Sequence, residues 1–367
     1  MNPIYLDNQA TTPLAPEVLD AMLPWLKDGF GNPHSPHLMG RRAAAAVEVA
    51  REQIAALLPE PGQVIFTGSA TEAINLAMGA ARSREARDQI VVVDTEHAAV
   101  RDTALWYETQ GFDTTLLPVD PQGLIRLEEL EASLGPQSAL VGAMLVNNEI
   151  GVIQPVERIA DMAHRAGALM LCDAVQGFGR IDIPQQADLV ALSGHKIYGP
   201  KGIGALWVRD GIDVPPLIHG GGQEQGIRSG TLSPALCAGL GAAATLCAER
   251  REEDNAHIGA LARQASRLFA DWTVNGSLEQ RYPGNLNIRR EGLDVARLIS
   301  DVRGVAFSAG SACASGSGRP SHVLAALGLA PEQVKSSIRL GFGRYNSMEE
   351  VEQAAHLINQ AVEKQLS

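Results

Sequence analysis

Lys196 is one of five lysines in the chain, and its surroundings are unusual for a residue whose role is only solubility. It directly follows the apolar run 188–192 and the residues Ser193-Gly194-His195. A partly desolvated amine loses its proton more easily, and a neutral lysine amine attacks an aldehyde to form a Schiff base. The alternative is a lysine whose stem lies along a strand edge while its charge stays in water. The neighbouring serine, histidine and glycine favour a crowded ligand site.

Asp173 ends the apolar run 168–172 and places a carboxylate at the carboxyl end of a predicted core strand. Such a position is costly unless the carboxylate meets a cation or several hydrogen-bond donors. The protonated ring nitrogen of pyridoxal phosphate is such a cation, and pairing with it makes the ring an electron sink. An N-cap for the following segment is an equally good interpretation of Asp173 alone. Gln176, three residues further on, is within reach of the same ligand.

The segment Gly68-Ser69-Ala70-Thr71-Glu72 follows the apolar run 64–67 and opens a predicted helix. Small residues at a helix N-terminus expose backbone N–H groups, and Thr71 adds a hydroxyl, so the segment suits a phosphate group. Ser69 and Glu72 also have the spacing of a capping box, which on its own explains the pattern better. The segment is neither a Walker loop nor a GxGxxG motif, so it does not favour a nucleotide.

His97 and Cys313 are two further side chains that could do chemistry. His97 follows the run 90–94, where its ring could stack on a planar cofactor and pass protons, although a polar loop histidine is the alternative. Cys313 stands in the Gly/Ser-rich segment 308–318, where no bulky or charged side chain provides an anchor. An accessible thiol of this kind suits a nucleophile that carries sulfur. The remaining cysteines fall in predicted core elements, as inert filler: Cys172, Cys237 and Cys247.

The elements that must position these residues alternate between short apolar runs and longer helical patterns from about residue 15 to residue 209. This alternation is the signature of an α/β fold with a mainly parallel sheet, in which ligands bind beyond the carboxyl ends of the strands. The predicted strands are 64–67, 90–94, 139–146, 168–173, 188–193 and 204–208. The predicted helices are 40–58, 71–81, 101–109 and 155–165.

The C-terminal third of the chain predicts a smaller α+β unit. The stretch 233–269 is rich in Ala, Leu and Arg and predicts a long helix that connects two domains. After it come weaker strand patterns at 285–288, 305–308 and 337–340, and helical patterns at 295–302, 323–327 and 348–364. We therefore expect a large domain formed by residues 15–250 and a small domain formed by residues 1–14 with 251–367.

The composition excludes several classes of protein. Hydrophobic residues make up 45% of the 367 residues and charged residues 20%, the balance of a globular protein in water. No apolar stretch approaches the roughly 20 residues of a membrane span, and the first residues lack the pattern of a signal peptide, so we expect a cytoplasmic protein. The net charge of −12 argues against binding to nucleic acid or anionic lipid. The cysteine spacings do not resemble a metal site.

Taken together, these segments resemble the cysteine desulfurases of the NifS/IscS-like group, in class V of the fold-type I pyridoxal-phosphate enzymes. The resemblance runs almost from end to end, and no single motif carries it alone. The matching motifs are Tyr5-Leu6-Asp7-Asn8-Gln9-Ala10-Thr11-Thr12-Pro13, Gly31-Asn32-Pro33-His34-Ser35, Asn147-Asn148-Glu149-Ile150-Gly151, Ser193-Gly194-His195-Lys196-Ile197-Tyr198-Gly199-Pro200-Lys201-Gly202, Arg228-Ser229-Gly230-Thr231, Gly310-Ser311-Ala312-Cys313 and Ser337-Ile338-Arg339.

The resemblance implies a role for each matching position. Lys196 is implied as the Schiff-base lysine, Asp173 as the partner of the ring nitrogen and His97 as the ring that stacks on the cofactor. The other implied contacts with pyridoxal phosphate are Asn148, Gln176, Ala70, Thr71, Ser193, His195 and, from the neighbouring subunit of a homodimer, Thr231. Asn148 and Arg344 are implied to hold the substrate, Arg344 by gripping its carboxylate, and Cys313 is implied to form a persulfide.

The activity implied is the conversion of L-cysteine to L-alanine, with the sulfur held on Cys313 for transfer to an acceptor protein. The long Gly/Ser-rich segment around Cys313 resembles the group that feeds iron–sulfur cluster assembly, where the acceptor is a scaffold protein. A selenocysteine lyase or an aminotransferase of the same fold is the first alternative, since either shares Lys196 and Asp173 but has no need of Cys313. A non-catalytic sulfur carrier that keeps the fold as a scaffold is the second.

Overall fold

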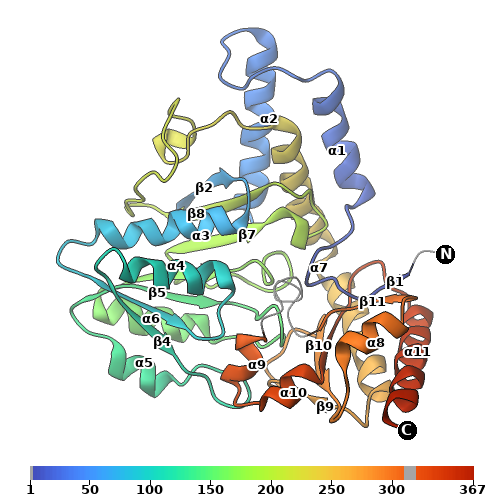
Figure 1. Cartoon of the computed structure of the whole chain (residues 1–367). Coiled ribbons are helices and arrows are strands. Elements are labelled where there is room, and N and C mark those ends of the chain that lie inside the picture. The colour runs from blue at the N-terminus through green and yellow to red at the C-terminus, as the bar shows by residue number, and fades with distance from the viewer. Residues whose placement is uncertain (1–2, 310–319) are drawn as a thin grey trace.

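The largest sheet of the computed structural model, which describes residues 3–309 and 320–367, has seven strands in that part of the chain (Figure 1). The strand order is β2-β8-β7-β6-β5-β3-β4, and β8 alone runs antiparallel to its neighbours. The strands are β2 (Gly62–Thr67), β3 (Gln89–Val93), β4 (Asp113–Leu117), β5 (Ser138–Met144), β6 (Leu169–Asp173), β7 (Leu189–Ser193) and β8 (Gly204–Arg209).

Both faces of this sheet are covered by helices, which is why its central strands are apolar without interruption. In β3, Ile90 and Val92 pack on one face while Val91 and Val93 pack on the other, as expected from the alternation of side chains along a strand. One face is covered by α3 (Ala70–Met78) and α4 (Ala98–Glu108), and the core of the other includes α1 (Pro16–Lys27), α2 (Leu38–Ala55), α5 (Leu127–Ser133) and α6 (Val156–Ala166).

The long helix α7 (Pro234–Leu268) takes part in two hydrophobic cores. Its first half contributes Cys237 and Leu240 to the core of the large sheet, and its second half contributes Ile258 and Leu261 to another core. That second core contains the sheet β12-β10-β9 and the parallel pair β1-β11. The elements in this part are β1 (Ile4–Tyr5), β9 (Thr273–Val274), β10 (Asn285–Arg289), α8 (Val295–Asp301), β11 (Val305–Ala306), α9 (His322–Ala326), α10 (Pro331–Lys335), β12 (Ser337–Gly341) and α11 (Met348–Leu366).

The beginning of the chain lies beside its C-terminal part, as Figure 1 shows for β1 and β11. Leu6 is buried in the second core, and the Gly341 N–H donates to the Leu6 carbonyl at 2.7 Å. These contacts bring the following residues, Asn8 to Thr12, to the region between the two sheets. No helix within the described ranges is both long enough and apolar enough to cross a membrane.

The predicted α/β class is confirmed, and all six predicted strands of the large sheet form. The strand β4 was not predicted because Asp113, Thr114 and Thr115 are polar and only Leu117 of this edge strand is buried. The helix α1 was not predicted, and Pro24 within it hides its helical pattern. The predicted helix 233–269 forms as α7. Residues 310–319, and with them Cys313, lie outside the described residues.

Candidate active site

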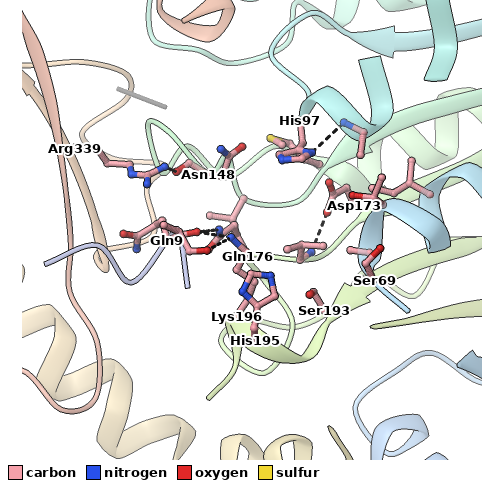
Figure 2. A pocket seen from close by; sticks show the side chains of 18 residues that line it. Gln9, Ser69, His97, Asn148, Asp173, Gln176, Ser193, His195, Lys196 and Arg339 are labelled. Atoms are coloured by element: carbon pink, nitrogen blue, oxygen red, sulfur yellow. Dashed lines mark hydrogen bonds between the residues drawn. The ribbon is translucent and has the colours of Figure 1, made fainter. Parts of the chain in front are cut away.

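A cavity of about 410 Å³ lies beyond the carboxyl ends of β5, β6 and β7, where an α/β sheet places its ligands (Figure 2). Nine of the residues predicted for the cofactor site line this one cavity, although they are scattered over more than a hundred positions of the chain. They are Ala70, Thr71, His97, Asn148, Asp173, Gln176, Ser193, His195 and Lys196. The other lining residues were not predicted for the site, and Gln9 and Arg339 are among them.

Lys196 lies at the end of a short turn that directly follows β7. Its Nζ donates to the carbonyl oxygens of Gln9 at 2.6 Å and Ala10 at 2.9 Å. Arg180 fixes the backbone of the same residue, because its guanidinium donates to the Lys196 carbonyl at 2.7 Å. The N-terminal segment was not predicted to hold the lysine, since it does so through backbone carbonyls that no residue type reveals.

Asp173 is buried at the end of β6, with 5% of its surface exposed. Its Oδ1 accepts from the Val175 N–H at 3.0 Å. Burial raises the pKa of this carboxyl, while the charges of His97 and Lys196 oppose the shift. A cation in the cavity would favour its ionised form, because an opposite charge nearby stabilises the charged state.

His97 caps α4, which fixes the ring at the rim of the cavity. Its Nδ1 accepts from the Ala99 N–H at 3.0 Å, so the helix start determines which ring nitrogen faces the backbone. Figure 2 shows His97 and Asp173 at the same end of the cavity. The residue before it, Glu96, is fully buried and its Oε1 accepts from the Met144 N–H at 2.8 Å. Burial raises the pKa of Glu96 well above its ordinary value, which favours the neutral form of this carboxyl.

The N-terminus of α3 forms another wall of the cavity. Ser69 caps the helix by accepting from the Glu72 N–H at 3.2 Å, and Glu72 accepts from the Gly68 N–H at 2.7 Å. Ser69 is therefore the N-cap, but Glu72 accepts from Gly68 and not from the Ser69 N–H, so only half of a capping box forms; the helix start still faces the cavity through Ala70 and Thr71. Free backbone N–H groups and the positive end of the helix dipole suit an anion here.

Gly204 allows this helix start to lie directly against the sheet. A Cβ atom at position 204 would come within 2.6 Å of the Ser69 carbonyl carbon and 2.8 Å of the Ala70 nitrogen. Real Cβ contacts are not this short, so any larger residue would displace the start of α3. The glycine thereby positions the anion-binding wall without contacting a ligand itself.

Ser193 and His195 complete this wall from the end of β7. His195 is half-buried and its Nδ1 lies 3.1 Å from the Thr11 hydroxyl oxygen. Burial, together with the charges of Lys196 and Lys201, lowers the pKa of His195 to about 4. The ring is therefore neutral at pH 7 and can donate one hydrogen bond.

The arginine at the cavity is Arg339 and not Arg344. Arg339 is 1% exposed on β12, where it donates to the Asn148 carbonyl at 3.0 Å and to Asp7 Oδ1 at 2.8 Å. Its Nε is buried without a hydrogen-bond partner among the described residues. Arg344 is instead paired with Asp254 through its Nε and one terminal nitrogen, and it does not line the cavity. The structure therefore places Arg344 outside the cavity where it was expected to grip the substrate carboxylate.

The pattern Ile338-Arg339-Leu340 did not single out Arg339, because a charge between two apolar residues is also typical of a strand with one face in water. The motif Ser337-Ile338-Arg339 was noted only as part of the resemblance. Thr231 is exposed and lies outside the cavity lining of this single chain. Its role in a neighbouring subunit stays a prediction. Among the described residues, no group of His, Cys, Asp and Glu side chains could hold a metal ion.

The two flanks of segment 310–319 are joined to the cavity wall. On one side, Ser308 and Arg339 exchange backbone hydrogen bonds at 3.2 and 2.7 Å. On the other side, the Ser321 hydroxyl donates to the buried Glu149 carboxylate at 2.5 Å, next to Asn148. The described residues on both sides of positions 310–319 therefore contact neighbours of the cavity.

The residues of this cavity fit pyridoxal phosphate. A phosphate suits the start of α3 with Ser193 and His195, a ring nitrogen suits the buried Asp173, and an aldehyde suits Lys196. Asn148 adds a buried Oδ1 that has no hydrogen-bond partner among the described residues. These donors and acceptors come from separate elements and line the same cavity. A hydrophobic core without a ligand would have no need of them.

Comparison with known proteins agrees with this geometry. The family model described as Aminotransferase class-V matches residues 4–354. A protein of Rickettsia africae named "Cysteine desulfurase IscS" is 44% identical over 375 residues, which cover 99% of this chain and 92% of the relative. A Schizosaccharomyces pombe protein named "Probable cysteine desulfurase, mitochondrial" is 43% identical and is covered to 75% of its length.

Solved structures show the same fold. One titled "NIFS-LIKE PROTEIN" superposes with a TM-score of 0.92 at 32% identity and covers 98% of this chain and 99% of its own. Another, titled "Crystal structure of DndA from streptomyces lividans", gives a TM-score of 0.81 at 34% identity, covering 91% of this chain and 98% of its own. The chain belongs to the class-V aminotransferase family and, within it, to the cysteine desulfurases.

Proposed function

We propose that this protein is a pyridoxal-phosphate-dependent cysteine desulfurase that releases L-alanine and keeps the sulfur as a persulfide on Cys313. The observation that carries the proposal is the meeting of Lys196, Asp173 and the N-terminus of α3 in one cavity that also contains an arginine. When bound, the cofactor supplies the electron sink that stabilises negative charge at the substrate α-carbon. The protein supplies position, charge and proton control.

The cofactor is held by groups at both ends of the cavity. The start of α3, Ser193 and neutral His195 would bind its phosphate, and Asp173 would pair with its ring nitrogen. His97 would stack on the ring, and the amides of Asn148 and Gln176 lie where they can donate to its polar edge. Lys196 would hold its aldehyde carbon and, once substrate has taken that place, move the α-proton.

The substrate is held by its carboxylate. We assign this contact to Arg339, because its Nε has no hydrogen-bond partner among residues 3–309 and 320–367 and its guanidinium lies at the cavity between Asn148 and Asp7. Guanidinium groups bind carboxylates in a bidentate manner, which fixes orientation as well as affinity. Asn148 lies beside it and would contact both substrate and cofactor.

The sulfur atom passes from the substrate to Cys313 in a nucleophilic displacement. The Cys313 thiolate attacks the substrate sulfur, a sulfur–sulfur bond forms, and the bond between the substrate Cβ and sulfur breaks. The electron pair returns to the substrate carbon, which takes up a proton and becomes L-alanine, while the persulfide remains on Cys313. A thiolate is the nucleophile in such reactions.

Two further proposals rest on the resemblance alone. They are a homodimer in which Thr231 completes the partner's phosphate site, and a sulfur-acceptor or iron–sulfur scaffold protein. The cytoplasmic location expected in the sequence analysis stays a proposal. An aminotransferase or selenocysteine lyase of the same fold would share the cavity but would not need Cys313. A non-catalytic sulfur carrier would not need Lys196 and Asp173 to meet.

One assay separates these functions. Protein loaded with pyridoxal phosphate is incubated with L-cysteine and a reductant, and alanine and sulfide are both quantified, for wild-type protein and Cys313→Ser. A desulfurase forms both products in equal amounts and the variant forms neither. Pyruvate or an amino-group transfer in place of alanine would contradict the proposal and favour an aminotransferase, and the absence of a visible cofactor band would favour the carrier.

A further inference from the structure

Tyr198 has a backbone conformation that bulky residues rarely adopt. It lies two residues after Lys196 with φ of 64°, in the left-handed region. A side chain with a Cβ is disfavoured there, so the surrounding contacts must hold the residue in place. Backbone strain of this kind is common at functional sites, where neighbouring contacts stabilise it.

The N-terminal segment holds the backbone of Tyr198. Its N–H donates to the Thr12 hydroxyl oxygen at 2.7 Å, and its carbonyl accepts from the Ala15 N–H at 3.0 Å. The Thr12 hydroxyl in turn donates to the His195 carbonyl at 3.0 Å. The turn that carries Lys196 is therefore hydrogen-bonded to the same N-terminal segment whose carbonyls accept from the Lys196 amine.

The C-terminal part of the chain holds the ring of Tyr198. The phenol oxygen accepts from the Arg344 N–H at 2.7 Å, and the Arg344 guanidinium lies 4.3 Å from the ring centroid. Gly343 is required for this approach, because a Cβ there would come within 2.9 Å of the phenol oxygen. Burial raises the pKa of Tyr198 to about 12, so the phenol stays neutral.

Asp254 on α7 fixes the guanidinium of Arg344. Arg344 Nε lies 2.9 Å and a terminal nitrogen 2.7 Å from Asp254 Oδ2, and the side chains are only 2% and 14% exposed. Burial alone would lower the pKa of Arg344, but the hydrogen bonds to Asp254 raise it above its ordinary value. A charged, bidentate pair of this kind has one geometry, so it can orient what is stacked on it.

We propose that Arg344, oriented by Asp254, is a positioning residue that clamps Tyr198 and thereby fixes the turn that carries Lys196. The expected effect on kcat rests on the proposed function, whereas the expected effect on the stability of the lysine turn does not. The clamp crosses from α7 and the end of β12 to the turn after β7, so it ties the placement of the lysine to both hydrophobic cores. Misplacing a catalytic group by about 1 Å can lower a rate by about a hundredfold.

The test compares Arg344→Lys and Asp254→Asn with Asp188→Asn as the matched control. Asp188 is also a buried carboxylate that pairs with an arginine, but it lies just before β7, at the end of that strand opposite to Ser193. The control should keep wild-type behaviour after correction for its folded fraction. Tyr198→Phe, which keeps the ring and removes only the hydroxyl, should give an intermediate effect.

The first readout is amide hydrogen exchange in the cofactor-free protein. In both clamp variants the amides of Tyr198 and Gly199 should exchange about tenfold faster than in wild type, because the turn opens locally more often. Amides of β10 should be unchanged. This measurement needs neither cofactor nor substrate, so it stands even where the wild-type protein fails to produce alanine and the proposed function falls.

The second readout is steady-state kinetics of the loaded enzyme with L-cysteine. The clamp variants should lose about tenfold or more in kcat with KM within about twofold, whereas Arg339→Lys should raise KM by about tenfold. A raised KM with unchanged kcat in Arg344→Lys would indicate that Arg344 binds the substrate, and it would overturn the proposal. Unchanged exchange and unchanged kcat in Asp254→Asn would overturn it as well.

Discussion

At the scale of single residues, Lys196 is distinguished by what surrounds its amine. Its Nζ donates to two backbone carbonyls of the N-terminal segment and lies in the same cavity as Asp173. Lys201, five residues further on, is exposed and lies outside the cavity lining. The two lysines therefore provide a test and its matched control within one short segment.

Lys196→Ala should abolish both the visible absorption of the bound cofactor and the production of alanine, because no other amine lines the cavity in the described part of the chain. Lys201→Ala should keep the absorption band and about the wild-type turnover. Spectra and alanine assays on purified, folded variants make the comparison. Alanine production by Lys196→Ala would remove this residue from the mechanism.

His195 should make the stability of the cofactor-free protein depend on pH. Burial lowers its pKa to about 4 in the folded state, below its ordinary value, so between about pH 4 and pH 6.5 the unfolded chain binds more protons at this site. The contribution is fully present above about pH 6.5 and is lost as the pH falls toward 4. Urea midpoints measured across this range should fall less steeply for His195→Asn than for wild type. Equal slopes would show that folding does not lower the pKa of His195.

At the scale of elements, the close packing of α3 on the sheet determines where the phosphate can bind. Gly204→Ala would place a Cβ against Ser69 and Ala70 and displace the helix start. Its affinity for pyridoxal phosphate, titrated by absorbance, should fall about tenfold or more, because helix N–H groups bind anions only at short range. Gly135→Ala is the control, since a Cβ there meets nothing within 4 Å. Equal affinities in the two variants would mean that the phosphate is held elsewhere.

Some strands of the large sheet could be predicted from the sequence and one could not. The buried strands could be predicted because both faces of the sheet are covered, and each therefore reads as an uninterrupted apolar run. The polar residues that follow these runs, such as Asp173 and Ser193, could be predicted as site residues because parallel strands end at one edge. The edge strand β4 could not, since three of its five residues are polar and it is only partly covered.

The choice between Arg339 and Arg344 could not be predicted in the same way. Arg339 lies within the predicted strand 337–340 and Arg344 follows it, and which of them faces the cavity depends on the backbone path around Gly341 and Gly343. Gln9 was missed for another reason: it contacts Lys196 and Gln176 through its backbone carbonyl, which every residue type possesses. Tertiary contacts made by the backbone leave no trace in the pattern of residue types.

At the scale of the whole molecule, α7 connects two hydrophobic cores, and the active-site cavity draws residues from both parts. We propose that the boundary lies near residue 250, between Cys247 in the first core and Ile258 in the second. The boundary is not complete, because Val323 and Val334 of α9 and α10 pack into the core of the large sheet. Through β1 and the stretch up to Thr12, the beginning of the chain joins the second core to the lysine turn.

The central claim is that sulfur passes from free cysteine to Cys313, and mass spectrometry tests it most directly. Loaded protein is treated with L-cysteine, alkylated and digested, and the extra mass of one sulfur atom is located. We expect the extra sulfur atom on the peptide that contains Cys313. We expect no extra sulfur on peptides with the buried Cys172, Cys237 or Cys247. Cys313→Ser should bind the cofactor and accumulate no persulfide. Extra sulfur on another cysteine, or full alanine production without Cys313, would contradict the account.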